Sequence, residues 1–465
     1  MTAYASTRGR APETGFAGAL MGGLASDGGL YVPTTWPRLE GVDALRGAPF
    51  GDVVAAVLRA LGADEDQQAA GRSAYEAFAH PAVAPLVQLG PEDWLLELHH
   101  GPTLAFKDVA MQALGRLFAG ELARTGETMS VVCATSGDTG GAAAAALAGL
   151  PNVTLTILFP HGRISEVQRR FMTTTGAANV ACLAVDGTFD DCQRIVKALF
   201  ADEGFRDAVH LAAVNSINWA RIAVQAAYYV TAALSLRGRA SFAVPTGNFG
   251  DAFAGILAKR LLAGDPGAAI GQVVAAVGEN DVLDRTLRTG EAAPRPVRAT
   301  QAPSMDIQVA SNFERMIWEA SGGDAELVSD LLARQGRGEP YALPAPVRAR
   351  IGEEVSSHAV SDEDAFAEMR RTRAETGLLL CPHTAIGRVG ARRARAAGLG
   401  GPIVTLATAH AAKFPGAVRR ATGATPDLPP RREGLMDAPE AARTVPAEVD
   451  AVADAIRALS RCVSP

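Results

Sequence analysis

The sequence predicts an α/β protein whose parallel-rich sheets are flanked by helices and preceded by a small N-terminal domain. From about residue 94 onward, short β-rich runs alternate with helical patterns, which is typical of parallel sheets. Glycine-rich turns follow several of these runs, at the strand ends where such sheets bind ligands. The first 93 residues lack this alternation, and 465 residues suffice for two or three domains. We therefore expect an N-terminal domain over 1–93 and a separate region over 94–465.

Two helices are expected in the N-terminal domain. Apolar residues recur at helical spacing over 50–61, which predicts an amphipathic helix. A shorter helix is predicted over 73–78, ending before Pro81 because the residue before a proline is disfavoured in the α region. We expect this small domain to pack against the rest of the chain.

Beyond residue 94, strands are predicted from short β-rich runs and helices from apolar residues on one face. The predicted strands are 128–134, 153–159, 180–185, 241–244, 273–277 and 403–407. The predicted helices are an alanine-rich one within 140–150, then 190–200, 217–236, 251–262, 313–320 and 324–334. The segment 291–303 contains several prolines and is expected to be a loop.

The composition is that of an ordinary globular protein and argues against several classes of function. Hydrophobic residues make up 48% and charged residues 20%, and the net charge of −6 comes without any long basic block. A nucleic-acid partner is therefore not expected. No apolar run approaches the ~20 residues that cross a bilayer, and residues 1–10 lack the apolar core of a signal peptide. We expect a cytoplasmic protein without a membrane partner.

The cysteines and histidines give no pattern of a metal site or a disulfide framework. The cysteines are odd in number and widely spaced, without a C-x-x-C pair. They are Cys133, Cys182, Cys192, Cys381 and Cys462. The eight histidines show no metal-ligand spacing, and no G-x-S-x-G elbow indicates a hydrolase triad. We therefore expect neither a metal nor a hydrolase.

One glycine-rich turn, Pro-Thr-Gly-Asn-Phe-Gly-Asp at 245–251, joins a predicted strand to a predicted helix. Such a turn directs several backbone N–H groups to the positive end of a helix dipole, which suits a phosphate dianion. A tight turn without any ligand is about equally compatible with this segment alone. The turn does not match the Walker pattern, so a nucleotide site of that class is disfavoured.

A second turn, Thr-Ser-Gly-Asp-Thr-Gly-Gly at 135–141, follows the strand 128–134. Hydroxyls from Thr135, Ser136 and Thr139 gather with free amides at a helix start, where a carboxylate or phosphate would bind. Capping of the helix by Thr139 or Asp138 explains part of this pattern, although a cap needs only one polar residue.

A third polar segment, Asn-Ser-Ile-Asn at 215–218, opens the predicted helix 217–236. Asn215, Ser216 or Asn218 would serve as an ordinary helix cap. Arg221 lies within the first two turns, and an arginine buried there would need an anionic partner. Taken alone, a solvated arginine is the simpler interpretation.

Lys107 lies among Leu104, Ala105 and Phe106 at the start of an amphipathic helical pattern. A lysine desolvated by such neighbours has a lowered pKa, which makes its amine a nucleophile. A single lysine at a helix start is more often a surface residue, so this signal is weak alone. Thr408 and His410 follow the strand 403–407, where ordinary strand-end packing is an equally simple explanation.

The sequence resembles the long-form threonine synthase family across essentially its whole length, through ten blocks in one order. The blocks are YASTRG at 4–9, GLASDGGLY at 23–31, HGPTLAFKD at 100–108, SGDTG at 136–140, GRISEVQR at 162–169, NSINWAR at 215–221, GNFGD at 247–251, SMDI at 304–307, HTA at 383–385 and TAHAAKF at 408–414. Ten ordered blocks are far more specific than any one of them. Ala411 stands where the family pattern has proline, which changes backbone stiffness but removes no functional group.

The resemblance implies a tryptophan-synthase-β-like fold that binds pyridoxal 5'-phosphate between two α/β subdomains, the smaller at roughly 125–225. Lys107 would be the Schiff-base lysine, Thr408 would bond the pyridine nitrogen, and Asp138 would approach the 3-hydroxyl of the cofactor. The cofactor phosphate would be held by the loop of Gly247, Asn248, Phe249, Gly250 and Asp251.

The resemblance also implies conversion of O-phospho-L-homoserine and water to L-threonine and phosphate by a pyridoxal-phosphate lyase. The substrate carboxylate would bind at Thr135, Ser136 and Thr139, and the substrate phosphate at Asn215, Ser216 and Arg221. Lys107 would shuttle protons while Arg221 stabilises the departing phosphate, and domain closure would admit water at one step only.

Two alternatives remain open: a related dehydratase or phospho-lyase that releases a keto acid, and a non-catalytic relative that binds the cofactor. The expected partner is a small-molecule substrate, and the expected assembly is a monomer or a weak homodimer. The sequence assigns no role to His383, His410, Arg163 or Ser165.

Overall fold

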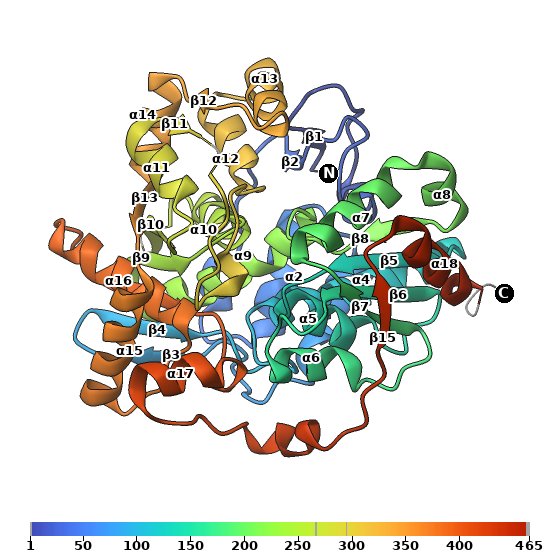
Figure 1. Ribbon diagram of the computed structural model, residues 1–465. Helices are drawn as coiled ribbons and strands as arrows, with labels where there is room; N and C mark the ends of the chain where they lie inside the picture. The colour runs from blue at the N-terminus through green and yellow to red at the C-terminus, as the bar shows by residue number, and fades with distance from the viewer. Residues whose placement is uncertain (1, 266, 294, 462–465) are drawn as a thin grey trace.

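The computed structural model describes residues 2–265, 267–293 and 295–461. These residues form two α/β units, each built on its own sheet, with the N-terminal segment packed beside them (Figure 1). This arrangement confirms the predicted fold class. Cys462 and residue 294 of the predicted loop 291–303 lie outside the described residues.

The larger sheet has six strands in the order β13-β10-β9-β14-β4-β3. Its strands are β13 (Val355–Ala359), β10 (Ala268–Val277), β9 (Gly238–Pro245), β14 (Ile403–Ala407), β4 (Asp93–Glu97) and β3 (Leu86–Gln88). All neighbours are parallel except β3, which runs antiparallel to β4 at one edge. The parallel strands therefore place the turns after β9 and β14 at the same edge of the sheet.

The smaller sheet has five parallel strands in the order β15-β7-β6-β5-β8. Its strands are β15 (Arg443–Pro446), β7 (Val180–Asp186), β6 (Val153–Pro160), β5 (Met129–Ala134) and β8 (Leu211–Ala213). In Figure 1 the chain leaves α17 (Pro415–Thr422) in the large unit, passes η5 (Pro430–Met436) and returns to β15. The last helix, α18 (Val449–Ser460), packs on this sheet. The sequence did not predict this return, because β15 is short and largely exposed.

The other predicted helices and strands are present, with ends shifted by a few residues. Helices α2 (Phe50–Ala60), α5 (Asp138–Leu147), α7 (Phe189–Ala201), α9 (Trp219–Leu236), α10 (Gly250–Leu261), α12 (Phe313–Ala320) and α13 (Ala325–Gly336) correspond to the predicted ones. Helix α9 begins later than predicted because the Asn218 side chain caps it by accepting a hydrogen bond from the Ala220 N–H (2.9 Å).

The predicted helix 73–78 is wrong. Only one 3-10 turn, Ser73–Tyr75, forms there, directly after the unpredicted helix α3 (Glu65–Arg72). The polar α3 is set by a capping box in which Asp64 and Gln67 satisfy each other's backbone amides. Tyr75 and Phe78 are instead buried in the core, where the centres of the Tyr75 and Phe50 rings lie 4.9 Å apart. The predicted loop 291–303 also begins with a short strand, β11 (Glu291–Ala292).

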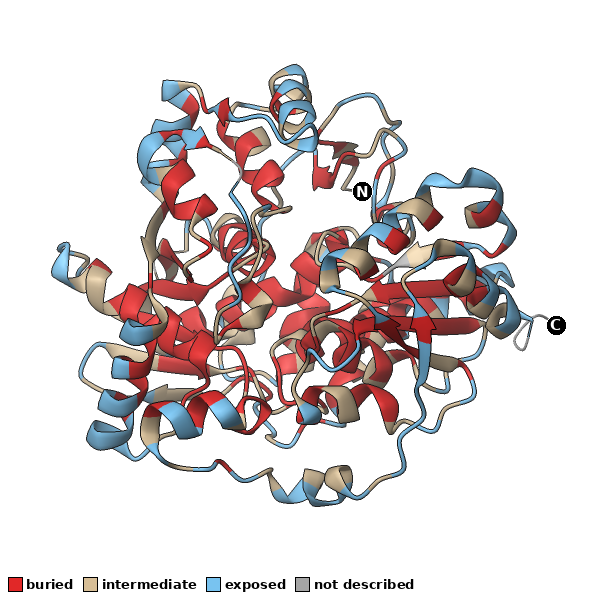
Figure 2. Cartoon of the chain, in the orientation of Figure 1, coloured by how far each residue is buried: buried red, intermediate tan, exposed pale blue. Residues whose placement is uncertain are grey.

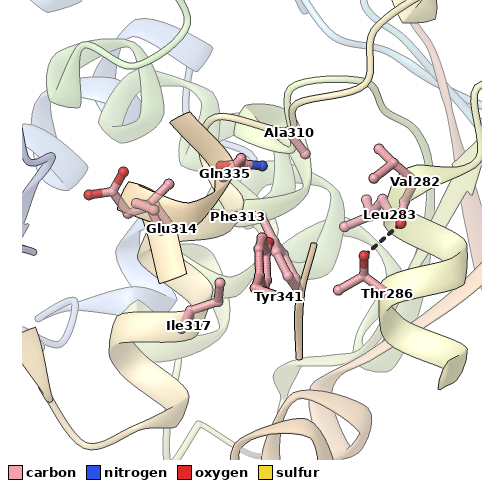
Figure 3. A pocket seen from close by; sticks show the side chains of 10 residues that line it. Val282, Leu283, Thr286, Ala310, Phe313, Glu314, Ile317, Gln335 and Tyr341 are labelled. Carbon is pink, nitrogen blue, oxygen red and sulfur yellow. Dashed lines mark hydrogen bonds between the residues drawn. The ribbon is translucent and has the colours of Figure 1, made fainter. Parts of the chain in front are cut away.

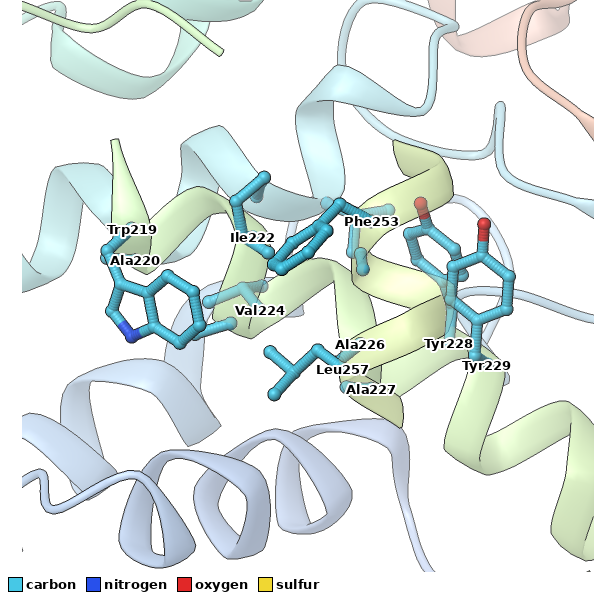
Figure 4. Close-up of a cluster of buried hydrophobic side chains, with 14 of the residues drawn as sticks. Trp219, Ala220, Ile222, Val224, Ala226, Ala227, Tyr228, Tyr229, Phe253 and Leu257 are labelled. Atoms are coloured by element: carbon cyan, nitrogen blue, oxygen red, sulfur yellow. The ribbon is translucent and has the colours of Figure 1, made fainter. Parts of the chain in front are cut away.

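The core centres on helices α9 and α10, which are buried along most of their length (Figure 2). Aromatic and aliphatic side chains of both helices pack into the same cluster (Figure 4). The Trp219 ring of α9 contacts the ring of Tyr4 at 5.5 Å, and the Tyr4 hydroxyl donates to the Leu61 carbonyl (2.6 Å). The N-terminal segment and α9 therefore share one core, which fixes the start of α9.

Two further observations concern the described part of the chain. Its helices include none that combines the length and apolarity needed to cross a membrane. Cys133, Cys182, Cys192 and Cys381, which lie within it, are buried free thiols.

A buried ion pair joins α15 (Asp362–Thr376) to α16 (Pro382–Ala396) under the large sheet. The Arg388 Nε lies 2.9 Å from Glu368 Oε1, and the two side chains are only 4% and 3% exposed. Arg392 bonds the second carboxylate oxygen at 2.8 Å. Glu368 therefore neutralises two cations on α16.

Replacing Glu368→Ala is expected to destabilise the protein by about 3–5 kcal/mol, because Arg388 would stay buried without a partner. Urea-induced unfolding measures this cost. The matched control is Glu363→Ala, whose pair with Arg370 is 79% and 48% exposed and should cost below about 1 kcal/mol. Equal costs for the two variants would contradict the buried-pair argument.

Candidate active site

Lys107 is the first residue of α4 (Lys107–Thr125) and lies beside the segment that follows β14. The Phe106 N–H donates to the Thr408 carbonyl (2.8 Å), and the His410 N–H donates to the Leu104 carbonyl (3.0 Å). Asp108 closes the turn before the helix by accepting from the Thr103 hydroxyl (2.6 Å). Lys107 and Thr408, distant in sequence, are thus held side by side by backbone pairing.

The Lys107 side chain is only 13% exposed, so the surface-lysine interpretation is wrong. Its Nζ lies 3.6 Å from Asp138 Oδ2 and 4.7 Å from the centre of the Phe106 ring. Burial lowers the pKa of Lys107, and Lys413 lowers it further, against the opposing pull of Asp138. The pKa of Lys107 is therefore shifted downward, toward the neutral form in which the amine is a nucleophile.

Asp138 lies at the start of α5, and both of its carboxylate oxygens have polar partners. Its Oδ1 lies 2.8 Å from Lys413 Nζ and accepts from Gln168 Nε2 (3.0 Å). Its Oδ2 accepts from the Ser304 hydroxyl (3.1 Å) and faces Lys107. Burial alone would raise the pKa of Asp138, but the ammonium groups of Lys413 and Lys107 outweigh it and hold that pKa well below its usual range. Asp138 is therefore an anion.

Lys413 is a site residue that sequence reasoning missed. It is fully buried in the 3-10 turn η4 (Ala411–Lys413). The available signal was a lone lysine within the apolar run Ala-Ala-Lys-Phe, where a charge needs a partner.

The turn before α5 is organised by Thr135, whose Oγ1 accepts from the Gly137 and Gly140 N–H groups (both 2.9 Å). Gly137 is the N-cap position, and α5 has no side-chain cap, so capping by Thr139 or Asp138 is wrong. A Cβ at Gly137 would lie 2.5 Å from the Gln168 side chain, which leaves room only for glycine. No hydrogen bond within the described chain occupies the side chains of Ser136 and Thr139, which stay available for a ligand.

In the turn before α10, the hydrogen bonds divide the predicted cofactor residues into two groups. The Thr246 hydroxyl donates to Asp251 Oδ1 (2.5 Å) and accepts from the Phe249 N–H (3.1 Å), so these two residues close the turn. Phe249 has a φ of 62° and packs its ring on Phe313 (5.4 Å).

The remaining amides of this turn belong to Gly247, Asn248 and Gly250. No acceptor for them lies among the described residues. They open toward the N-terminus of α10, where a phosphate gains both hydrogen bonds and the helix dipole.

Arg221 is 2% exposed, so the solvated interpretation of this residue is wrong. Its Nη1 donates to the Val214 carbonyl (2.8 Å), whereas its Nε has no partner in the described structure. Burial lowers the pKa of Arg221 to about 10, which Cys133, Asp251 and Tyr228 partly oppose. Asn215 and Ser216 lie just before α9 and are half-buried. A buried guanidinium with an unpartnered Nε could hold an anion.

Thr408 presents another unsatisfied group. Its side chain is 4% exposed, and its Oγ1 has no hydrogen-bond partner within the described residues. A buried hydroxyl without a partner costs about 1–3 kcal/mol. A ligand atom with a lone pair, such as a pyridine nitrogen, would satisfy it. The free amides, Thr408 and Lys107 together fit a phosphorylated pyridine aldehyde.

The structure shows the surroundings of three residues to which the sequence assigned no role. His383 Nε2 accepts from the Ser304 N–H (3.3 Å), and its ring packs on Phe414. Ser165 caps α6 (Glu166–Thr173) and donates to the Lys413 carbonyl (3.1 Å). Arg163 is exposed.

Behind the Lys107 segment lies a cavity of about 320 Å³, lined in part by His99, His100, His410 and Arg432. His100 Nε2 lies 2.8 Å from Glu97 Oε2, and potential ligand atoms of Glu97, His99 and His100 lie within 4.8 Å of one another. The spacing of the histidines did not predict this group, although Glu-x-His-His at 97–100 was its visible signal in the sequence.

A second pocket, between α11 (Val282–Thr289) and α12, has only about 20 Å³ (Figure 3). That is room for about one water molecule, so this pocket is no cofactor site.

The buried histidines predict a loss of stability in acid. Burial lowers the pKa of His383 to about 4, although Asp138 opposes the shift. Because the unfolded chain binds the proton near pH 6.5, stability is expected to fall as pH drops from about 6.5 to about 4, by up to about 1.4 kcal/mol per pH unit. Melting of cofactor-free protein across this range measures the slope.

In the variant His383→Gln, the melting temperature should fall less steeply with decreasing pH below about pH 6, because one titrating group is lost. The difference in melting temperature between this variant and the parent protein near neutral pH measures the effect of the substitution on packing alone. An unchanged slope in acid would refute the assignment to His383.

Comparison with known proteins agrees with this geometry. The family model described as pyridoxal-phosphate dependent enzyme matches residues 81–339. Models described as threonine synthase N terminus and threonine synthase, C-terminal, match residues 3–70 and 384–456. A threonine synthase of Pseudomonas aeruginosa is 44% identical over 456 residues, which covers 96% of each chain.

Solved structures show the same likeness. The crystal structure of PLP-bound threonine synthase from Brucella melitensis is 46% identical with a TM-score of 0.93, covering 99% of this chain and 100% of that one. The yeast threonine synthase structure is 35% identical with a TM-score of 0.91, covering 99% of both chains. Pyridoxal 5'-phosphate is therefore the cofactor, and the chain belongs to the threonine synthase family.

Proposed function

We propose that the protein converts O-phospho-L-homoserine and water to L-threonine and phosphate, with Lys107 holding the cofactor covalently. One observation carries this proposal. A desolvated lysine lies next to the segment of Thr408, and neither the buried Thr408 Oγ1 nor the Arg221 Nε of the same site has a partner among the described residues. Family membership over nearly the whole chain supports the substrate.

The cofactor would be held at its two ends. The amides of Gly247, Asn248 and Gly250 would bind its phosphate, and the Thr408 hydroxyl would bond its ring nitrogen. Asp138 would lie near its 3-hydroxyl, and Asp251 and Phe249 would keep the phosphate loop closed. Once bound, the cofactor supplies an electron sink for the carbanions formed next to it.

Lys107 would also move the protons of the reaction. With the substrate bound, the Lys107 Nζ would act as the base that takes the proton from the substrate Cα. A neutral amine is needed for this step, and burial at Lys107 favours that form. The same amine would remove a proton from Cβ and return protons at Cγ and finally at Cα, while Cβ receives the hydroxyl of water.

The two acidic groups of the substrate would bind at separate places. Ser136, Thr139 and the amides near Thr135 would hold the carboxylate at the start of α5. Arg221, with Asn215 and Ser216, would hold the phosphate and stabilise its charge as it leaves. Closure of the two units would exclude water until it is needed.

We further propose a cytoplasmic enzyme that is a monomer or a weak homodimer. The free thiols of the described cysteines are typical of a reducing compartment. Sedimentation across a concentration series tests the assembly, since a weak dimer dissociates on dilution.

Incubation with O-phospho-L-homoserine is expected to yield threonine and phosphate in equal amounts, with little 2-oxobutyrate. The variant Lys107→Ala should lose at least about a thousandfold in turnover, because both attachment and proton transfer are removed. Measuring the three products together decides between functions. A keto acid as the main product would instead indicate a dehydratase or phospho-lyase.

The variant Arg221→Met is expected to lower kcat/KM by about 10²–10³-fold, because the departing phosphate loses its buried cation. Inorganic phosphate should also inhibit this variant more weakly. Steady-state kinetics measure both effects. Arg206→Met is the matched control, since Arg206 pairs with Asp207 at the surface, and equal losses in both variants would argue against a phosphate role.

A further inference from the structure

Lys413 reaches from the large unit into the site of the small one. Its Nζ lies 2.8 Å from Asp138 Oδ1 and 5.3 Å from the centre of the Phe171 ring. Its backbone is fixed as well, since the Lys413 N–H donates to the His410 carbonyl (3.1 Å) and its own carbonyl accepts from Ser165. Lys413 therefore has little freedom to move.

Two lysines thus compete for one carboxylate. Asp138 lies 2.8 Å from Lys413 and 3.6 Å from Lys107, so the tighter pair is with Lys413. Gln168 and Ser304 hydrogen-bond the same carboxylate, so Lys413 holds Asp138 in place together with them. Among the described residues, Asp138 is the only ion-pair partner of Lys413.

We propose that Lys413 is a positioning residue that anchors the Asp138 carboxylate and so keeps the Lys107 amine loosely paired and reactive. Lys413 touches neither substrate nor cofactor in this role and acts through Asp138. The inference rests on the proposed function, because it assumes that Lys107 carries the cofactor.

Electrostatics support the direction of this effect. Burial lowers the pKa of Lys107, and Lys413 lowers it further, while Asp138 raises it. Without Lys413 the repulsion would vanish and Asp138 could pair fully with Lys107, so both changes would raise the pKa of Lys107. The other charged or titratable groups facing this cluster are Asp108, Arg221, Asp251, His383 and Cys381. They stay in place when Lys413 alone is changed.

The test is the rate at which pyridoxal phosphate attaches to cofactor-free full-length protein, followed by absorbance across a pH series. In Lys413→Met the midpoint of the rate profile should rise by about one pH unit, which means about tenfold slower attachment below the midpoint. Lys413→Arg, which keeps the charge, should restore the original midpoint. Lys259→Met is the matched control, since Lys259 pairs with Glu354 at 2.6 Å elsewhere, and its midpoint should not move.

Dependence on Asp138 is tested by a double-mutant cycle. The Lys413→Met shift should shrink markedly in an Asp138→Asn background, where no carboxylate remains to be anchored. If Lys413→Met fails to fold, Lys413→Gln should show the same upward shift. A folded variant that lacks the shift, or an undiminished shift in the Asp138→Asn background, overturns the proposal.

Lys107→Ala separates this inference from the proposed function. Attachment should vanish in that variant, as judged by borohydride trapping and mass measurement of the protein. Continued covalent attachment would refute the proposed role of Lys107. Loss of attachment in Lys107→Ala together with an unmoved midpoint in Lys413→Met would refute only the role of Lys413.

Discussion

The candidate site depends on one buried carboxylate that faces two buried ammonium groups. Asp138 comes from the small unit, whereas Lys107 and Lys413 enter from segments that pair beside β14. Charges cannot be buried without partners at acceptable cost, so each of these side chains constrains the other two. Arg221 is buried nearby, and its Nε has no hydrogen-bond partner among the described residues. Such a cation suits a cofactor and a substrate that both carry phosphate.

The fold supplies this charge arrangement by bringing the carboxyl ends of strands together. The turns after β5, β9 and β14 each present polar groups at the start of a helix or beside Lys107. Helix α9 is buried on nearly all sides and carries both Arg221 and Trp219, and the Trp219 ring contacts Tyr4 of the N-terminal segment. The packing of helix α9 in the core therefore also fixes the position of Arg221. The returning C-terminal strand β15 ties the two units together at the far edge of the small sheet.

Local sequence patterns were sufficient to predict the helices and strands whose structure is determined by their own residues. Strands such as β6 and β10 are buried runs rich in apolar residues, and both predictions were confirmed, although β10 begins five residues earlier than predicted. Prediction failed where tertiary contacts or polar caps decide, as in the polar α3, the single turn at Ser73–Tyr75 and the exposed β15. For the site, hydrogen bonding separated residues that the sequence grouped: Asp251 and Phe249 close their turn, while Gly247 keeps its amide free.

The sequence by itself determined the fold class and the family, and it predicted which residues carry chemistry, because ordered motifs and turn composition can be recognised without the tertiary structure. It placed Lys107 at a helix start but left open whether that lysine is buried, and it gave Lys413 no role. Only the tertiary structure decided both, since desolvation and ion pairing depend on segments far apart in the chain. The same reason applies to Arg221 and Thr408, whose unsatisfied atoms become meaningful only when their burial is known.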